Sequence, residues 1–374
     1  MNRYSFDLNS LSSASRIATE KLQSILDGAA QPGPEEISRL TEALNVPALF
    51  LAARPGELPK ETVPDLRSFP GNVGRPISPT NLVTISRLKK LQKFATRIAD
   101  EYQRDFDTTF PRLALRLNDL IEFSAEQRKI FNLTDEMQLS DSFDLVWFLR
   151  LNFERAGIIT HFRSFDEAGA FRAACLLTRG APPLVALNTN DTKKGARAFS
   201  LMHEFAHILL RQNGVSDFAR ADSRTEALCN SFAANFLMPK DLVYKVLREI
   251  RKETTLNEWA LRRAATKLKV SHYAVAYRAY ELDMVSGDFF KQFVARYVNY
   301  KAPSKGRGGG MDFYKFYINR FGPLFLSRLI SAYDRLSVST PELYQIFELK
   351  PRHLGVLGER IRLFLEGGKE EPDQ

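Results

Sequence analysis

The chain has 374 residues, of which 44% are hydrophobic, so it is long and apolar enough for a sizeable core and for more than one domain. Charged residues make up 26%, close to the average of globular proteins, which excludes wholesale disorder. The formal net charge is +9, but the basic residues are spread in short clusters that are typical of solvated helix faces. Charge alone therefore gives only weak support for a nucleic-acid partner.

The sequence predicts a cytoplasmic protein without a membrane partner. No run of 18 or more apolar residues occurs, so we expect no membrane span. The first residues lack the charged start and apolar run of a secretory signal. Cys175 and Cys229 have no neighbour at zinc-finger spacing, and we expect both to be small buried residues in a reducing compartment.

Residues 1–62 read as a segment of short helices. Pro34 and the two glutamates after it open one of these helices, because proline suits the first turn and acids suit a helix N-terminus. Gly28 ends the helix before it. Residues 63–80 are rich in proline and glycine, which predicts a linker lying over a neighbouring domain.

The rest of the chain predicts an α+β fold that is mostly helical. Hydrophobic periodicity predicts helices over residues 81–103, 109–125, 142–155, 193–212, 223–237, 240–252, 256–268 and 271–283. A small sheet or hairpin is expected from β-like runs at 157–162, 171–177 and 184–187. We therefore divide the chain after the linker into a domain over 81–285 and a C-terminal helical domain over 286–374, the latter with an unassigned sensing or partner-binding role.

One helix carries a metal-binding motif. His203-Glu204-Phe205-Ala206-His207 is an H-E-x-x-H sequence within the helix predicted over 193–212. Residues four apart lie on one helix face, so both imidazoles can reach one zinc ion. Glu204 then lies beside the metal, where it can take a proton from bound water. The pattern predicts a zinc hydrolase, and the alternative is a helix with two structural histidines.

A catalytic zinc ion needs a third protein ligand and an open fourth position. The metzincin extension would place glycine at 210 and histidine at 213, and the chain has Leu210 and Asn213 there, which excludes that class. The remaining option is an acid on a following helix, which makes Glu226 the leading candidate.

Glu226 lies 19 positions after His207, a distance that suits a helix, a short loop and a returning antiparallel helix. Asp217 and Asp222 are rival ligands in the loop, and we favour Glu226 because a helix holds a ligand more rigidly. Asn230 lies one turn after Glu226 on the same face, where it could accept the ring N–H of a ligating histidine.

These motifs resemble those of a known family. The shared pieces are the HEFAH helix, Glu226-x-x-Cys229-Asn230, Phe232-Ala233-Ala234 and the ending Leu237-Met238-Pro239. Together they look like the ImmA/IrrE family of bacterial metallopeptidases, clearly over about 155–285 and more weakly on both sides. The resemblance implies a gluzincin-like fold and one zinc ion per chain, with His203, His207 and Glu226 as ligands and Glu204 as the catalytic acid/base.

The resemblance also implies a protein substrate and a regulatory role. Members of the family typically cut helix-turn-helix repressors, which induces stress, mobile-element or defence genes, and many carry a helix-turn-helix of their own. Residues 19–28 look like the recognition helix of such a domain, and residues 32–50 look like its closing helices. Little room remains for a full first helix, and residues 1–60 are slightly acidic, which disfavours DNA binding.

Two further assignments concern the substrate. His272 and Tyr273 lie at the start of a predicted helix. They are candidate hydrogen-bond donors to the oxyanion that forms during peptide hydrolysis, and the alternative for each is a structural role. The strand over Leu184, Val185, Ala186 and Leu187 could hold the substrate as an added β-strand.

Other classes of function remain open at this stage. One is a DNA-binding or adaptor regulator with a structural or idle metal site, and Glu204→Gln would discriminate it from an enzyme. Another is the sensor arm of a toxin–antitoxin or phage-defence module, in which residues 286–374 bind a ligand or partner.

Overall fold

The computed structural model describes residues 8–44, 65–67, 79–98, 119–164, 172–189, 194–211, 223–251, 256–299 and 312–366, and every structural statement below concerns these residues. The architecture is mostly helical around one small sheet, which confirms the predicted α+β class. None of the helices in these ranges combines the length and apolar character that crossing a bilayer requires.

Three helices form the N-terminal segment, α1 (Leu8–Ser15), α2 (Thr19–Leu26) and α3 (Pro34–Leu44). Pro34 begins α3 as predicted, and Gly28 follows the end of α2 with a φ of +74°. Their apolar faces form a small core of their own, made by Leu11, Ile17, Leu22, Leu40 and Ala43. The first helix, for which the sequence leaves little room, is present but is only eight residues long.

Four strands form the sheet, in the order β1-β3-β4-β2. They are β1 (Asp65–Arg67), β2 (Ile159–Arg163), β3 (Ala173–Leu176) and β4 (Leu184–Asn188). β2 runs parallel to β4, whereas β3 pairs antiparallel with both β4 and β1. β1 falls inside the predicted linker over 63–80, so part of that segment belongs to the sheet.

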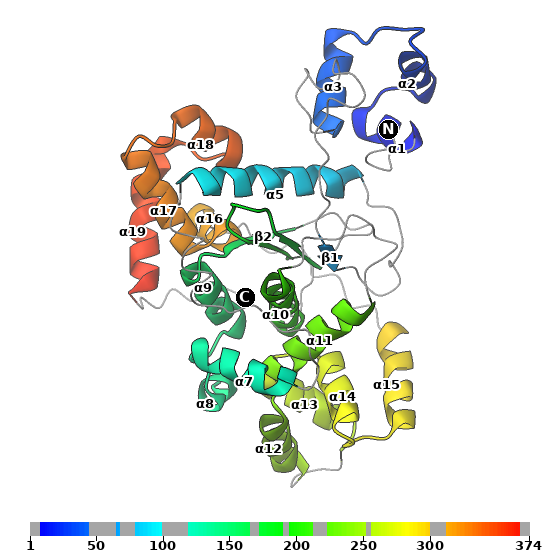
Figure 1. Cartoon of the computed structure of the whole chain (residues 1–374), viewed down its shortest axis with the longest axis vertical. Helices are drawn as coiled ribbons and strands as arrows, with labels where there is room; N and C mark the ends of the chain where they lie inside the picture. The colour runs from blue at the N-terminus through cyan, green and yellow to red at the C-terminus, as the bar shows by residue number, and fades with distance from the viewer. Residues whose placement is uncertain are drawn as a thin grey trace.

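Alternate residues of the sheet enter two different cores. Val185 and Leu187 of β4 pack into the larger core, whereas Leu184 and Ala186 pack into the second. This alternation follows from the two-residue period of a strand, and it means that both faces of the sheet are buried. Figure 1 shows the two sides, with α5 on one side of the sheet and α10 on the other.

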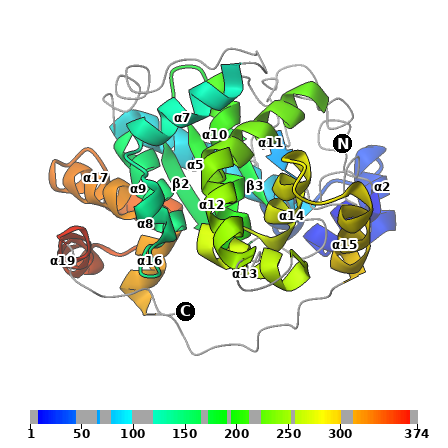
Figure 2. The ribbon, with the colours of Figure 1, turned by 90° about the horizontal axis from the view of Figure 1, so that it is seen from below.

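On the first face, α9 and α10 lie directly against the strands. The core on this side is built by the helices of the middle of the chain (Figure 2). These are α7 (Leu120–Ile130), α8 (Asp135–Leu139), α9 (Leu145–Arg155), α10 (Lys194–Leu210), α11 (Ser223–Leu237), α12 (Lys240–Arg251), α13 (Glu258–Leu268), α14 (His272–Glu281) and α15 (Gly287–Asn299).

The second face packs against α5 and the C-terminal helices. These are α5 (Pro79–Ile98), α16 (Phe313–Phe321), α17 (Pro323–Asp334), α18 (Thr340–Phe347), the 3-10 turn η2 (Pro351–His353) and α19 (Leu354–Leu365). Among the described residues after 286, α15 contributes Phe293 to the first core, whereas α16–α19 share the second core with the sheet.

The predicted helices agree best with the structure where the hydrophobic periodicity extends over many residues. The helix over 223–237 has the predicted bounds, and those over 193–212 and 240–252 differ by one or two residues at their ends. Most of the helix predicted over 109–125 lies outside the described residues, and its last part falls within α7, which spans Leu120–Ile130. The short helix α8 was not predicted.

The prediction that β4 holds the substrate as an added strand is wrong. Leu184, Val185, Ala186 and Leu187 each pair with β2 on one side and with β3 on the other. A central strand has no backbone groups left for a further strand. The outer strands of the sheet are β1 and β2. The sequence could not show this, because three apolar runs do not reveal their order in a sheet.

A buried ion pair joins the two halves of the fold. The Arg150 Nε donates to Glu154 Oε1 at 2.9 Å, and the Arg150 Nη1 donates to the backbone oxygen of Asn319 at 2.6 Å. Glu154 Oε2 accepts the backbone N–H of Leu324 at 2.9 Å. Both charged side chains on α9 therefore contact the α16–α17 connection, where Gly322 has a φ of +86°.

Gly322→Ala is expected to lower the free energy of unfolding by about 3 kcal/mol, because that backbone conformation is almost restricted to glycine and the added Cβ would meet the buried carboxylate. The Cβ would lie 1.8 Å from Glu154 Oε1. Denaturant unfolding measures the effect. Gly355→Ala in α19 is the matched control, since its Cβ meets nothing within 4 Å. Equal stability of the two variants would contradict the prediction.

Candidate metal centre

The two motif histidines lie on a deeply buried part of α10. Every residue of α10 from Ser200 to Leu210 is buried. The helix packs against β3 and β4 on the sheet and against α11, which carries Glu226 and Asn230. Because α10 and α11 are both packed into the first core, the side chains between them are held by rigid elements.

Three donor atoms converge between these helices. His203 Nε2 lies 3.1 Å from His207 Nε2, as expected for one helical turn with both rings turned to one side. Glu226 reaches both rings, with Oε2 at 3.3 Å from His203 Nε2 and Oε1 at 3.3 Å from His207 Nε2. These three residues form a group able to hold a metal ion.

The triangle matches the dimensions of a zinc site. Zinc binds imidazole nitrogen and carboxylate oxygen at about 2.0–2.1 Å, so the ligands of a tetrahedral ion are about 3.3 Å apart. The observed separations are 3.1, 3.3 and 3.3 Å. Three protein ligands also leave the fourth tetrahedral position for water or substrate, which is the arrangement of a catalytic zinc site.

Each histidine has a second contact behind the triangle. Asn230 Oδ1 lies 3.0 Å from His203 Nδ1, the contact expected from the helical spacing. The Cys229 thiol forms a hydrogen bond with the His207 side chain. The sequence predicts only a small buried residue at Cys229, and its position three residues after Glu226 was the available signal, because residues three apart share a helix face.

The charges of the candidate ligands and of Glu204 stabilise one another. Burial opposes ionisation of Glu226, but hydrogen bonds from His203 and His207 hold the pKa of its carboxyl well below the usual value. Burial likewise disfavours the charged form of His207, but hydrogen bonds with Cys229 and Glu226 and the charge of Glu204 raise its pKa to about 12. The carboxylates therefore attract a positive charge at the place where a divalent cation would lie.

Glu204 is buried beside this group. Its relative exposure is 1%, and both carboxylate oxygens are shielded from solvent. Its charge acts on His207, which places it within electrostatic reach of the centre. A carboxylate in a site that excludes water interacts strongly with nearby charges, which suits a group that has to exchange a proton.

The other predicted site residues have different outcomes. Asp217 and Asp222, the rival ligands, lie outside the described residues. His272 and Tyr273 are the first two residues of α14. The turn before α14 lies close to α10 at Gly195, where an added Cβ would be 2.2 Å from the Val270 carbonyl carbon. Gly195 precedes His203 by eight residues, or about 12 Å along a helix. The oxyanion role of His272 and Tyr273 stays a prediction.

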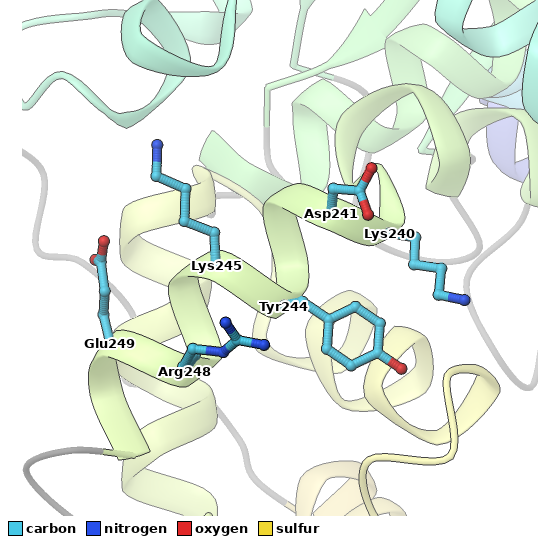
Figure 3. A pocket seen from close by; sticks show the side chains of 6 residues that line it. All are labelled: Lys240, Asp241, Tyr244, Lys245, Arg248 and Glu249. Carbon is cyan, nitrogen blue, oxygen red and sulfur yellow. The ribbon is translucent and has the colours of Figure 1, made fainter.

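A pocket elsewhere on the surface does not belong to this centre. Figure 3 shows it on α12, where one helix supplies all the lining side chains, namely Lys240, Asp241, Tyr244, Lys245, Arg248 and Glu249. A single exposed helix face with mixed charge gives no converging set of ligands, and none of these residues is part of the metal-binding group.

The chain shows a family relationship over its middle part. Residues 153–280 match the family described as the IrrE N-terminal-like domain, Peptidase_M78. The matched range includes β2, β3, β4 and the helices α10 to α13, and thus the whole group of three candidate ligands. No curated protein and no solved structure matches the chain.

Asn230→Ala is expected to weaken zinc binding by about tenfold to 100-fold, because the amide oxygen fixes the ring orientation of His203. Competition with a chromophoric chelator measures the affinity. Asn152→Ala in α9 is the control, since Asn152 bonds only the Phe148 carbonyl within its own helix and should leave zinc affinity unchanged. Equal zinc affinities of the two variants would contradict the role of Asn230.

Zinc binding at pH 7 is expected to release about one proton, because the raised pKa leaves His207 protonated in the metal-free protein and a ligating imidazole must be neutral. The apparent affinity should then rise about tenfold for each unit of increasing pH below that pKa. Calorimetric titration in buffers of different ionisation enthalpy counts the protons. A heat of binding that does not depend on the buffer would show that His207 is already neutral.

Proposed function

We propose that the chain is a zinc-dependent endopeptidase centred on His203, His207 and Glu226, which all lie in the range 153–280 that matches the IrrE N-terminal-like family of peptidases. The observation that supports this proposal is the triangle of donor atoms at 3.1 to 3.3 Å, which fits a tetrahedral zinc ion. The cytoplasm is the proposed location, since Cys175 and Cys229 are both free thiols, which fits a reducing compartment.

The protein residues divide the work of peptide hydrolysis. Zinc, when bound, supplies a Lewis acid that polarises the scissile carbonyl and acidifies a water molecule. Glu204 takes the proton of the attacking water and later passes it to the leaving amine, so one carboxylate serves as base and then as acid. Asn230 and Cys229 hold the two imidazoles in orientation.

The burial of Glu204 suits this role. A carboxylate within a largely apolar helix binds a proton more readily than one in water, while the positive charge of the metal favours release. The two influences oppose each other, which keeps the group able to accept and donate within one reaction cycle. Glu226 differs, because both its oxygens are directed to the histidine rings at 3.3 Å.

A transcriptional repressor with a helix-turn-helix is the proposed substrate, and stress, mobile-element or defence genes are the proposed targets of its removal. The support for this part is the resemblance to the ImmA/IrrE family. The described N-terminal helices carry three basic and five acidic residues over 8–44, so contact with DNA phosphates receives little electrostatic support. We propose that α1–α3 contact a protein.

A second candidate is a regulator that binds a partner through these helices and does not use its metal centre for catalysis. The separate core of α1–α3 favours it, because a small unit with its own core suits an adaptor. The two candidates differ in their need for Glu204, which the enzyme requires and the adaptor does not.

Glu204→Gln is expected to lower peptide hydrolysis by at least about 100-fold while zinc stays bound, because the amide cannot accept the proton. The experiment incubates the zinc-loaded full chain with the repressor encoded beside its gene and follows fragments by mass spectrometry. Glu249→Gln, an exposed glutamate on α12, is the matched control. Fragmentation by the Glu204 variant at the rate of the control would remove the proposed acid/base, whereas no fragmentation by either the control or the unaltered chain would favour the adaptor.

A further inference from the structure

Of the four strands that the structure describes, β1 is the shortest and comes from the most distant part of the chain. It spans Asp65–Arg67 and pairs with β3 alone, whereas β3 and β4 each pair on both sides. The other three strands all lie within residues 159–188. β1 is therefore an added strand at the edge of a sheet that the later part of the chain forms by itself.

The pairing of β1 with β3 is short. β1 runs antiparallel to β3, and its three residues lie opposite residues 175, 174 and 173 in turn. β2 and β4, by comparison, are paired at five positions. Pro64 directly precedes β1 in the sequence, and a proline has no N–H with which to extend the ladder. Each backbone hydrogen bond contributes only modestly, because water can replace it, so a strand of this length is displaceable.

The edge of β3 that β1 covers lies on the same side of α10 as the candidate metal centre. α9 is in contact with β2, whereas α10 is in contact with β3 and β4. Figure 1 shows α9 and α11 on opposite sides of α10, with β1 on the side of α11, and Figure 2 shows the same order of the three helices. The three candidate ligands lie between α10 and α11, which is the side of β1.

The centre is also most accessible on the side of α11. The side chains of His203 and His207 on α10 are 1% and 3% exposed, whereas the side chain of Glu226 on α11 is 32% exposed. A substrate therefore approaches the metal past α11 and not through the core around α10. An extended segment that comes from this side passes along the edge of the sheet that β1 occupies.

The backbone of β3 offers a substrate the same groups that it offers to β1. Extended peptides are commonly bound as an additional strand at a sheet edge, where main-chain hydrogen bonds supply the affinity. β4 occupies the other side of β3, so the edge under β1 is the one that β3 can present. β2, the other outer strand, lies on the α9 side, away from the centre.

We propose that β1 is a built-in competitor of the substrate. Residues 65–67 occupy the place on β3 where an extended segment of the protein substrate binds, and hydrolysis requires that this segment replaces them. The inference rests on the proposed peptidase function, and it defines the substrate as a chain segment that can lie extended along β3. The exchange conserves the backbone hydrogen bonds of β3, so its energetic cost is small.

The position of β1 in the chain gives this exchange a means of control. β1 follows α3 and precedes α5, and these two helices are in contact. A protein that binds to α1–α3 is therefore bound to the part of the chain that leads directly into the competing strand. Such a partner activates the enzyme if it favours the state in which the β3 edge is open.

Binding of a free peptide tests the exchange without any hydrolysis. The probe is a fluorescein-labelled peptide with the sequence of residues 61–70, titrated with the zinc-loaded full chain and followed by fluorescence anisotropy. Successive backbone N–H groups of a strand point to opposite sides, so the double variant Leu66→Pro/Arg67→Pro removes at least one donor directed at β3. We expect this variant to bind the peptide at least about tenfold more tightly than the unaltered chain, because its β3 edge is open.

The matched control is Leu66→Ala/Arg67→Ala, which changes the same two side chains and keeps both N–H groups. It should bind the peptide like the unaltered chain. Leu66→Gly/Arg67→Gly weakens the strand without removing a donor, and it serves if the double-proline variant fails to fold. Equal peptide affinities of the strand-breaking variant and the alanine control would overturn the inference.

Cleavage of the repressor encoded beside its gene relates the exchange to the proposed function. At subsaturating substrate we expect the double-proline variant to cut the repressor about tenfold faster than the alanine control, because no competitor has to leave. Tighter peptide binding without cleavage by any variant would contradict the peptidase but still support a displaceable β1. Equal cleavage rates of the two variants would reject the inhibition by β1 and leave the peptidase intact.

Discussion

Everything at the candidate centre depends on the approach of Glu226 to two imidazoles one helical turn apart. The three donor atoms are 3.1 to 3.3 Å from one another, a spacing that costs energy unless a proton or a cation lies between them. The raised pKa of His207 and the lowered pKa of Glu226 are two expressions of this constraint. Protonation relieves it in the metal-free protein, and zinc would relieve it in the enzyme.

The fold holds this arrangement through burial on both faces of a small sheet. α10 is buried over its motif because it lies between the first face of the sheet and α11. The second face would expose Ile159, Ala174 and Leu184 to water if α5 and the C-terminal helices were absent. The buried pair of Arg150 and Glu154 joins these helices to α9. The C-terminal helices therefore stabilise the sheet that supports α10, the helix with the H-E-x-x-H motif.

Local patterns allowed much of the fold to be predicted, because they depend on residues close in sequence. The hydrophobic periodicity of α11 and the H-E-x-x-H spacing of α10 each depend on residues within one helix. The structure has both helices where the sequence predicts them. The meeting of Glu226 with the two histidines follows from two rigid helices joined by a short segment. The roles assigned to these residues still await experiment.

Features that depend on contacts between distant segments were missed for a physical reason. The order of the strands is a choice among pairings that the apolar runs of β2, β3 and β4 satisfy equally well, so β4 was wrongly placed at an edge. The packing of His161 and Arg320 on the ring of Phe321 joins residues far apart in the chain, and each reads alone as an ordinary side chain. A buried charge becomes visible as unusual only when its neighbours are known.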